Sequence, residues 1–319
     1  MTLVGAVDVG GTTTRAAVVG ESGFRAVART PTAGGRAVAD TVITCLRDAM
    51  ARAGVADCEL SGIGVSIPGP LTADRRQVAF TGNVGLREYP LPALLEREFS
   101  VPVQMDDDAT AAALAEARIG AGRRAGIVFL IIAGTGVGGG LVVRGEPYRG
   151  AHSAAGELGH VPVHLDGPRC SCGSFGCLEA VASGQALAAR GQGALARGGS
   201  PVLAELASND PARVTAEMVF EAARRGEVAA VRAVEITGRY LGMGAAAVAN
   251  ILDPDLVILG GGLGRQPRIV EAAAAEVAAR CIPPIDREVT VLAGELGDDA
   301  GLWGAAMLAD PALRDIRVA

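Results

Sequence analysis

Three consecutive carboxylates stand where an apolar run gives way to a helical pattern. Asp106, Asp107 and Asp108 directly follow Met105, the last residue of a predicted strand. Capping a helix requires only one acidic side chain, so capping does not account for the other two. Phosphoryl transfer to an alcohol requires a carboxylate that accepts the proton of the hydroxyl. One of the three is therefore a candidate general base.

A compact Cys/His group supplies the second set of reactive side chains. Cys170, Cys172 and Cys177 fall within eight positions, and His160 precedes them by ten residues. Three thiolates and one imidazole form a closed Cys₃His ligand set, which is typical of structural zinc. The second ring nitrogen of His160 stays available to contact a neighbouring group.

Three glycine-rich turns follow apolar strands, at residues 8–13 (DVGGTT), 134–140 (GTGVGGG) and 259–263 (LGGGL). Glycines let backbone N–H groups approach an anion, and threonine hydroxyls add donors. The first turn alone is equally well explained as a plain hairpin, but a nucleotide explains all three together. The predicted nucleotide-binding residues are Asp8, Gly10, Gly11, Thr12, Thr13, Gly134, Thr135, Gly136, Gly138, Gly261 and Gly262. Asp8, at a strand end, is also placed to hold Mg²⁺ through water.

Two common nucleotide-binding motifs are disfavoured. Residues 134–139 match GxGxxG, but a strand-like segment (Leu141 to Val143) follows, where a dinucleotide-binding motif would open a helix. All 29 basic residues are Arg, so the lysine of a Walker A loop is absent.

Composition excludes further classes of protein. The net charge of -6 and pI of about 5.3 argue against nucleic-acid binding. The opening segment is too short and glycine-rich for a signal peptide, and we find no apolar run typical of a membrane span. We expect a cytoplasmic protein with no nucleic-acid or membrane partner.

The order of predicted elements indicates a duplicated architecture. Strands are expected at 4–9, 15–19, 62–67, 101–105, 126–132, 141–143, 256–259 and 289–293, and helices at 35–53, 91–99, 109–119, 267–280 and from 300. Helical patterns also dominate 185–249. Because the series strand, glycine turn, strand occurs twice, we predict an α/β fold of two duplicated domains with a cleft between them. The expected domains are 1–118 and 119–319, with the last helix packing back on the first domain.

The motifs together resemble the ROK family (repressors, open reading frames and sugar kinases) and, more widely, the actin-like ATPase (ribonuclease H-like) fold. The resemblance covers nearly the whole chain. It includes DVGGT at 8–12, IPGP at 67–70, GNVGL at 82–86, IAGTGVGGGLVVRG at 132–145, GELGH at 156–160 and CSCGSFGCLE at 170–179. The pair ExGH and CxCGxxGCxE is the most specific part.

The resemblance implies an ATP-dependent hexose kinase that phosphorylates the 6-hydroxyl of glucose or a similar sugar. Asp108 is then the catalytic base, and Glu157, His160 and Glu179 contact the sugar 1- and 2-positions. Asn83 and Asp107 contact the 3- and 4-positions, and Gly69 belongs to the same substrate site. The resemblance further implies ATP with Mg²⁺, a structural Zn²⁺ on His160, Cys170, Cys172 and Cys177, and a homo-oligomer, either a dimer or a tetramer.

One departure from the family pattern bears on the substrate. Related sequences usually read E-N-D-A-N where this chain reads Asp106-Asp107-Asp108-Ala109-Thr110. Asn offers a donor and an acceptor, whereas an ionised Asp only accepts. A carboxylate at Asp107 would pair with an ammonium group on the 3-position, so one hypothesis is a 3-amino sugar such as kanosamine (3-amino-3-deoxyglucose). The other is that Asp107 accepts a hydrogen bond from the ordinary 3-hydroxyl.

Two alternatives are less favoured. An N-acetylhexosamine kinase, acting on N-acetylglucosamine or N-acetylmannosamine, differs by a single polar contact that sequence does not resolve. A non-catalytic, sugar-sensing regulator of the same family is expected to carry a DNA-binding segment before the first glycine turn, and only seven residues precede Asp8.

Overall fold

The computed structural model describes residues 2–81 and 84–316 of the 319-residue chain. The chain divides into two compact units. Unit 1 comprises Met1–Ala125, Gly140–Gly156 and Glu295–Ala319, and unit 2 comprises Gly126–Gly139 and Glu157–Gly294. The chain therefore passes between the units at 125/126, 139/140, 156/157 and 294/295. Both units are discontinuous in sequence, whereas the predicted domains, 1–118 and 119–319, are continuous.

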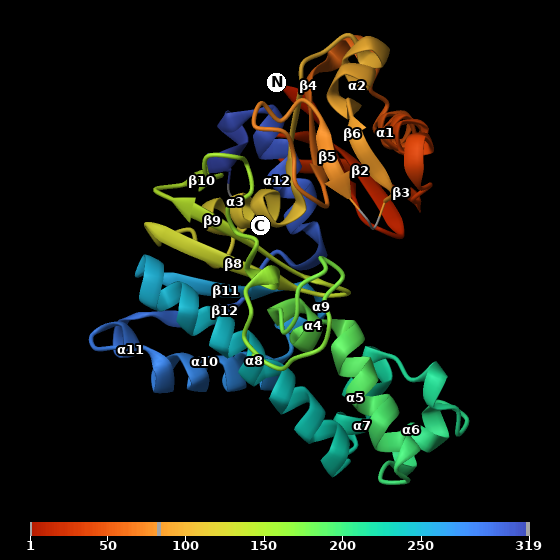
Figure 1. Ribbon diagram of the computed structural model, residues 1–319. Helices are drawn as coiled ribbons and strands as arrows, with labels where there is room; N and C mark the ends of the chain where they lie inside the picture. Colours follow the sequence, from red (N-terminus) through yellow and green to blue (C-terminus); the bar gives the residue numbers. More distant parts are fainter. Residues whose placement is uncertain (1, 82–83, 317–319) are drawn as a thin grey trace. The chain divides into compact units, whose positions relative to one another are not determined.

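A five-stranded sheet forms the centre of unit 1 (Figure 1). Its strands are β1 (Leu3–Val9), β2 (Thr13–Gly20), β3 (Gly23–Pro31), β4 (Leu60–Ile67) and β7 (Val103–Asp107), in the order β3-β2-β1-β4-β7. β1 pairs antiparallel with β2 and parallel with β4. One core cluster joins this sheet to α1 (Val38–Ala53), α2 (Leu91–Phe99) and the hairpin of β5 (Val78–Thr81) and β6 (Leu86–Tyr89).

The second sheet repeats this topology. Its strands are β8 (Ile127–Ala133), β9 (Val137–Val143), β10 (Glu146–Tyr148), β11 (Leu256–Gly260) and β12 (Thr290–Ala293), in the order β10-β9-β8-β11-β12. Numbered along the chain, each described sheet reads third, second, first, fourth, fifth. In both, the first strand pairs in parallel with the fourth and the fourth with the fifth. The duplication predicted from the two strand–glycine turn–strand series is present.

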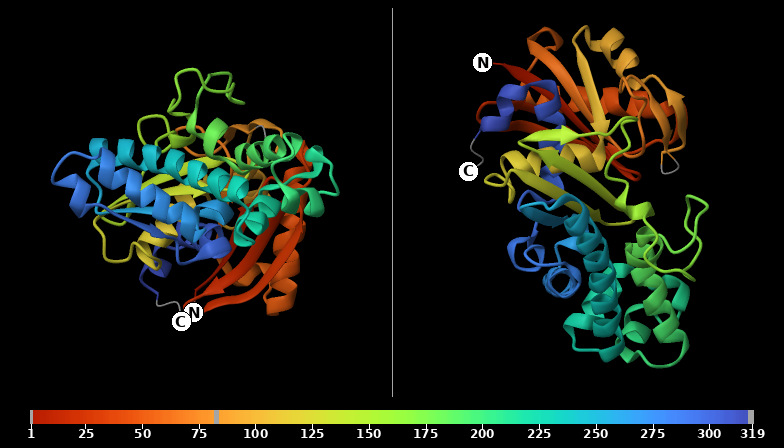
Figure 2. Two further views of the ribbon diagram at one scale, coloured as in Figure 1. Left: turned by 90° about the horizontal axis from the view of Figure 1, so that it is seen from below. Right: turned by 60° about the vertical axis from the view of Figure 1, so that its left-hand side comes forward.

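Helices make up most of unit 2 outside the sheet. They are α4 (Leu178–Ala182), α5 (Gly184–Ala196), α6 (Pro201–Leu206), α7 (Ala216–Arg224), α8 (Val228–Leu252), α9 (Gly261–Gly264), α10 (Pro267–Arg280) and α11 (Ile285–Glu288). α8 and α10 run side by side (Figure 2). A Cβ at Gly242 would lie 2.7 Å from the Cα of Ala273, so a glycine there permits this close packing.

A pair of helices in unit 1 fixes the acidic junction in place. α3 (Asp108–Arg118) follows β7 directly, and α12 (Ala300–Ala309) packs on α3, β1 and β4 (Figure 1). Any side chain at Gly304 would overlap the backbone of Ala111, and any at Gly64 would overlap that of Ala305. Because residues 109–117 of α3 are all buried, the helix has little freedom to move within unit 1.

Short 3₁₀ turns complete the elements: η1 (Gly35–Ala37), η2 (Asp57–Glu59), η3 (Leu158–His160), η4 (Pro211–Arg213), η5 (Gly297–Asp299) and η6 (Pro311–Asp315). Within residues 2–81 and 84–316, no helix combines the length and apolar character needed to cross a bilayer.

The structure corrects the sequence expectations at several elements. β3, the β5–β6 hairpin and the short helix α4 were not predicted, and residues 137–140 continue β9 where a turn was expected. Position 140 in that strand requires a glycine because a Cβ there would come within 2.6 Å of the carbonyl oxygen of Ala109. Residues 261–264 form the single helical turn α9, not a plain turn.

Candidate functional site

The three aspartates at the β7–α3 junction have different partners. Asp106 is buried, and its Oδ2 lies 2.6 Å from Nη2 and 2.7 Å from Nε of Arg149. Asp107 caps α3, accepting the backbone N–H groups of Ala109 at 3.1 Å and Thr110 at 3.2 Å. Asp108 is the first residue of α3 and is half-buried. The fold thus separates three adjacent carboxylates into an ion-paired group, a helix cap and a group at the start of the helix.

Burial changes the acidity of the middle aspartate. It raises the pKa of Asp107 to about 8, and the nearby charge of Asp108 adds to the rise, against the hydrogen bonds from Thr110. At neutral pH Asp107 is therefore largely protonated in the ligand-free protein. A protonated carboxyl offers one O–H donor together with acceptor oxygens, which is the hydrogen-bonding capacity of an asparagine.

The first glycine turn joins β1 to β2 in unit 1. Gly11, Thr12 and Thr13 are exposed, and the turn is closed by the N–H of Gly10 donating to the carbonyl of Thr13 at 3.0 Å. Such a turn presents backbone N–H groups and hydroxyls to solvent, where an anion can reach them.

Asp8 lies at the end of the strand that leads into this turn. The hydroxyl of Ser66 donates to its Oδ1 at 2.9 Å. A Cβ at Gly301 would lie 2.6 Å from its carboxylate carbon, so the start of α12 also confines it. Burial raises the pKa of Asp8, although the Ser66 hydrogen bond and the charge of Arg15 oppose the rise. A nearby cation would stabilise the ionised form, and a carboxylate oxygen is a ligand that Mg²⁺ accepts.

The other two glycine turns lie in unit 2. Thr135 is exposed at the tip of the 134–138 turn, and the carbonyl of Gly134 accepts the N–H of Gly184 at 2.7 Å. Gly261 has φ +78°, and a Cβ there would overlap the backbone of Ala133, so only glycine fits. Gly262 is exposed at the start of α9. Both turns therefore expose backbone next to one another in the fold of unit 2.

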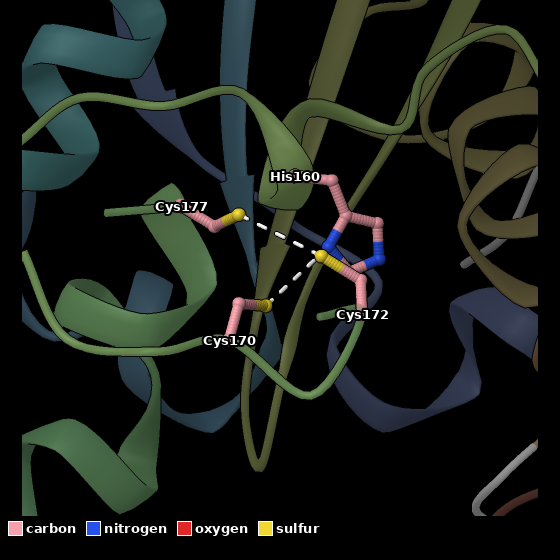
Figure 3. Close-up of side chains that lie close together, drawn as sticks. All are labelled: His160, Cys170, Cys172 and Cys177. Carbon is pink, nitrogen blue, oxygen red and sulfur yellow. Dashed lines mark hydrogen bonds between the residues drawn. The ribbon is translucent and has the colours of Figure 1, made fainter. Parts of the chain in front are cut away.

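The four predicted metal ligands come together in unit 2 (Figure 3). Their ligand atoms all lie within 4.8 Å of one another. The Sγ of Cys170 is 3.7 Å from Nδ1 of His160, and the Sγ atoms of Cys172 and Cys177 are 3.8 Å apart. Tetrahedral Zn–S bonds of about 2.3 Å place two sulfurs roughly 3.8 Å apart. The donor set and its spacing therefore fit a zinc ion.

The two carboxylates predicted to bind sugar border this cluster. Glu157 Oε2 lies 3.9 Å from Nε2 of His160, so the ring directs one nitrogen to the cysteines and the other towards Glu157. Glu179 accepts the backbone N–H of Val137 at 3.1 Å and the hydroxyl of Ser171 at 3.2 Å. Glu179 thereby connects the cysteine loop to the strand that follows the 134–138 turn.

The remaining predicted site residues are placed as follows. Gly69 lies in the turn after β4 with φ +102°, where a side chain would overlap the carbonyl oxygen of Phe80. Asn83 lies outside the described residues. Arg149, the ion-pair partner of Asp106, was not predicted. It stands in a segment without periodicity, and no feature of the sequence connects it with position 106, 43 residues earlier.

Comparisons with known proteins identify the family of the chain. The family model described as "ROK family" matches residues 4–312. The chain is 33% identical to the glucokinase of Halalkalibacterium halodurans over 95% of this chain and 93% of that one. A crystal structure of a ROK family glucokinase from Streptomyces griseus, in complex with glucose and AMPPNP, superposes with a TM-score of 0.87 at 32% identity. That match covers 97% of this chain and 99% of the other.

A regulator gives a weaker match. The xylose repressor of Bacillus spizizenii is 28% identical over 78% of this chain, and the matched part is 61% of the repressor. Because the family model spans nearly all of the chain, the protein belongs to the ROK family. Its fold is the actin-like ATPase α/β fold of the ROK sugar kinases, as the sequence indicated.

Proposed function

We propose that this protein is an ATP-dependent hexose kinase that phosphorylates the 6-hydroxyl of glucose or of a closely similar sugar. The observation that carries the proposal is the full-length likeness to the Streptomyces griseus glucokinase, which was crystallised with glucose and an ATP analogue. The glucokinase match also extends over 93% of its relative, whereas the repressor match leaves more than a third of that protein uncovered.

Asp108 is the proposed general base. It is the half-buried first residue of α3, where its Oδ1 accepts the N–H of Ala109 at 2.8 Å, and it stands at the position of the base in the family pattern. A base with this role accepts the proton of the 6-hydroxyl as the oxygen attacks the γ-phosphorus of ATP. The products are the sugar 6-phosphate and ADP.

The sugar contacts follow the family pattern. We assign Glu157, His160 and Glu179 to the 1- and 2-hydroxyls, and Asp107 with Asn83 and Gly69 to the rest of the ring. Within unit 2, the 3.9 Å approach of Glu157 to His160 supports a shared ligand for these two side chains. In unit 1, the capping bonds of Asp107 fix its position on α3.

The exposed glycine turns are assigned to the nucleotide. The N–H groups and hydroxyls of residues 10–13 and 134–138 suit phosphate oxygens, and Gly261 with Gly262 suits the nucleoside end. Asp8 would hold Mg²⁺ through water, and that ion, when bound, neutralises phosphate charge. The residues themselves orient the nucleotide and need no lysine, which this chain lacks.

Zinc is the proposed occupant of the Cys₃His group. All four ligand positions are protein side chains, so the site has a structural role and leaves no open position for catalysis. Its proposed effect is to fix His160 and, through the cysteine loop, Glu179. None of the six cysteines, all of which are described, forms a disulfide, which is consistent with a reducing, cytoplasmic location. A homo-oligomer remains a proposal that light scattering would test.

A 3-amino sugar such as kanosamine is the second candidate substrate, because Asp107 occupies the position where the family usually has Asn. The raised pKa of Asp107 distinguishes a sugar with a 3-hydroxyl from one with a 3-ammonium group. A neutral Asp107 can donate to a 3-hydroxyl as Asn would, whereas an ammonium group would hold the carboxylate ionised. Binding of the amino sugar would then release a proton, and binding of glucose would not.

A coupled assay of ADP formation tests both proposals. It would compare glucose, kanosamine, glucosamine, mannose, N-acetylglucosamine and N-acetylmannosamine at equal concentrations. A kcat/KM for kanosamine at least tenfold above that for glucose, lost in Asp107→Asn, would establish the amino-sugar substrate. Equal or higher kcat/KM for glucose would contradict it and leave a glucokinase. Activity only with an N-acetylated sugar would contradict both.

A further inference from the structure

A buried carboxylate outside the proposed site engages two distant parts of the chain. Glu116, near the end of α3, is 2% exposed. Its Oε2 accepts the N–H of Ala121 at 3.0 Å and that of Glu295 at 3.2 Å, and its Oε1 accepts the N–H of Leu296 at 2.9 Å. Burying a carboxylate costs free energy unless hydrogen bonds satisfy it. These three hydrogen bonds offset that cost for Glu116.

The three N–H groups lie next to two of the crossings between the units. Ala121 stands four residues before the crossing at 125/126, and Glu295 is the first residue after the crossing at 294/295. One side chain therefore holds both connecting segments to unit 1, although they are 174 residues apart in sequence.

Two further contacts tighten the same group. Arg123 Nη1 lies 2.6 Å from Oε2 of Glu295 and donates to the carbonyl of Gly120 at 2.9 Å, so it also joins the two segments. A side chain at Gly120 would overlap the carboxylate of Glu116. The chain thus provides a glycine where the carboxylate needs room. We call Glu116, Arg123 and Glu295, with their bonded backbone, the connector clamp.

The helix that carries the clamp also carries the proposed base. Asp108 is the first residue of α3, and Glu116 lies eight residues further along the same helix, about 12 Å away along its axis. The intervening residues are all buried, and α12 packs on them. A shift of the connecting segments relative to α3 is therefore a shift relative to Asp108.

We propose that Glu116 is a positioning residue for phosphoryl transfer: it fixes two connections to unit 2 against the helix that bears the catalytic base. The inference rests on the proposed function, because its effect on turnover requires that Asp108 is the catalytic base. Misplacement of reacting groups by about 1 Å can cost 10²-fold in rate, so a clamp far from the chemistry affects turnover.

The test compares Glu116→Gln with Glu276→Gln. Glutamine keeps the shape of Glu116, but its NH₂ group would face a backbone N–H, and two donors cannot bond. Glu276 of α10 is a matched control because it is also buried, at 8% exposure, yet it forms ion pairs with Arg239 of α8 and Arg280 of α10, away from both connections. Amide hydrogen exchange, melting temperature and the kcat/KM for glucose are measured for both variants and the parent protein.

We expect Glu116→Gln to speed amide exchange at least tenfold in both 119–126 and 294–298, while 108–115 keeps its protection. Its kcat/KM should fall by about 10- to 100-fold well below its melting temperature. Glu276→Gln should lose comparable stability and keep its kcat/KM within about threefold.

Two results would overturn the inference: a Glu116→Gln protein within twofold of the parent kcat/KM, or an equal loss in both variants at equal melting temperature. A parent protein inactive on every sugar would instead contradict the proposed function. The exchange measurement would then still decide whether Glu116 holds the two connections, since exchange does not depend on activity.

Discussion

The two sheets have the same strand order but carry different side chains at the ends of their strands. In the first, β1 runs through Asp8 near its end and β7 ends at Asp107, so carboxylates stand at the ends of parallel strands. In the second, the matching strands β8 and β12 end in Ala133 and Ala293. Topology has been kept in both copies, while acidic groups stand at these strand ends only in the first.

The second sheet's contribution comes from its glycine turns and from the segment between β10 and β11. That segment holds the Cys₃His group together with Glu157 and Glu179. In the proposed assignment, the carboxylates for proton transfer and for Mg²⁺ come from the first copy alone, whereas backbone donors and sugar contacts come from both copies, and the sugar contacts next to the Cys₃His group come from the second. Substitutions in one copy or the other can test each part of this assignment separately.

The largest effect is expected at the first sheet. Asp108→Asn should lower kcat about 10³-fold, within the usual range for a lost general base, because an amide cannot take the hydroxyl proton. Glucose affinity by calorimetry should change less than about threefold. Asp57→Asn, on the exposed turn η2, is the control and should leave kcat unchanged. Residual activity above a tenth of the parent value would remove Asp108 from the mechanism.

In the second copy, loss of the zinc should weaken sugar binding and leave proton transfer unchanged. Cys177→Ser should reduce bound zinc from about one per chain to near zero and raise the glucose KM about tenfold or more, because His160 and Glu179 lose their support. Elemental analysis and kinetics check both. Cys58→Ser replaces an exposed cysteine outside the cluster and should do neither. A zinc-free Cys177→Ser protein with normal KM would separate the metal from sugar binding.

A neighbouring pair of glycines sharpens the role of the 134–138 turn. A Cβ at Gly136 would lie 2.5 Å from Oε2 of Glu179, whereas nothing lies within 4 Å of one at Gly134. Gly136→Ala should therefore raise the glucose KM by several-fold, up to about tenfold. Gly134→Ala should leave the glucose KM unchanged and alter only the KM for ATP if this turn holds phosphate. The opposite pattern, with glucose affected by Gly134→Ala, would reverse the assignment.

The smallest expected effect is on how the stability of the folded protein changes with pH. Because folding raises the pKa of Asp107 to about 8, the folded chain holds a proton that the unfolded chain has lost between about pH 4 and 8. This contribution to stability is fully present below pH 4 and is lost as the pH rises through 8. Asn caps helices as well as Asp does. Because an amide does not titrate, Asp107→Asn should remove this loss of stability at high pH.

Melting curves at pH 5 and pH 8.5 check this expectation. The melting temperature of Asp107→Asn minus that of the parent should increase by a few degrees at the higher pH. Asp74→Asn is the control whose difference should not change between these pH values, because hydrogen bonds from the Thr72 hydroxyl and the Arg76 backbone lower the pKa of that exposed carboxyl, which is therefore ionised in the folded and the unfolded chain at both. A difference for Asp107→Asn that stays constant with pH would show that Asp107 is ionised throughout.

Local signals in the sequence predicted much of this molecule. The helix at 91–99 matches α2, that at 267–280 matches α10, and the strand ends at Val9 and Ile67 match β1 and β4. The Cys/His cluster was predicted because Cys and His at such short spacing are typical of a metal site in a chain of this kind, and the structure brings the four side chains together. The strand ends of both sheets were found because glycine turns follow them.

Long-range partners were beyond local reasoning. β3 was missed because its alternation of polar and apolar residues is weak, and the strand is fixed by pairing with β2. The glycines of 138–140 signalled a turn, but pairing with β8 places them in a strand, and of the three Gly140 packs closely on α3. Arg149 and Glu116 depend on partners 43 and up to 180 residues away, and no spacing rule connects such positions.

The position of α12 in the sequence affects how the protein is made. Val4, Ala6 and Val19 of the first sheet share a core cluster with Leu302 and Met307 of α12. During synthesis the strands of this face are made first, and α12, which covers them, is made only after all of unit 2. Unit 2 has most of its chain available earlier. The half of the molecule that is translated first is therefore the half that finishes folding last, and it is the one most exposed to aggregation on the way.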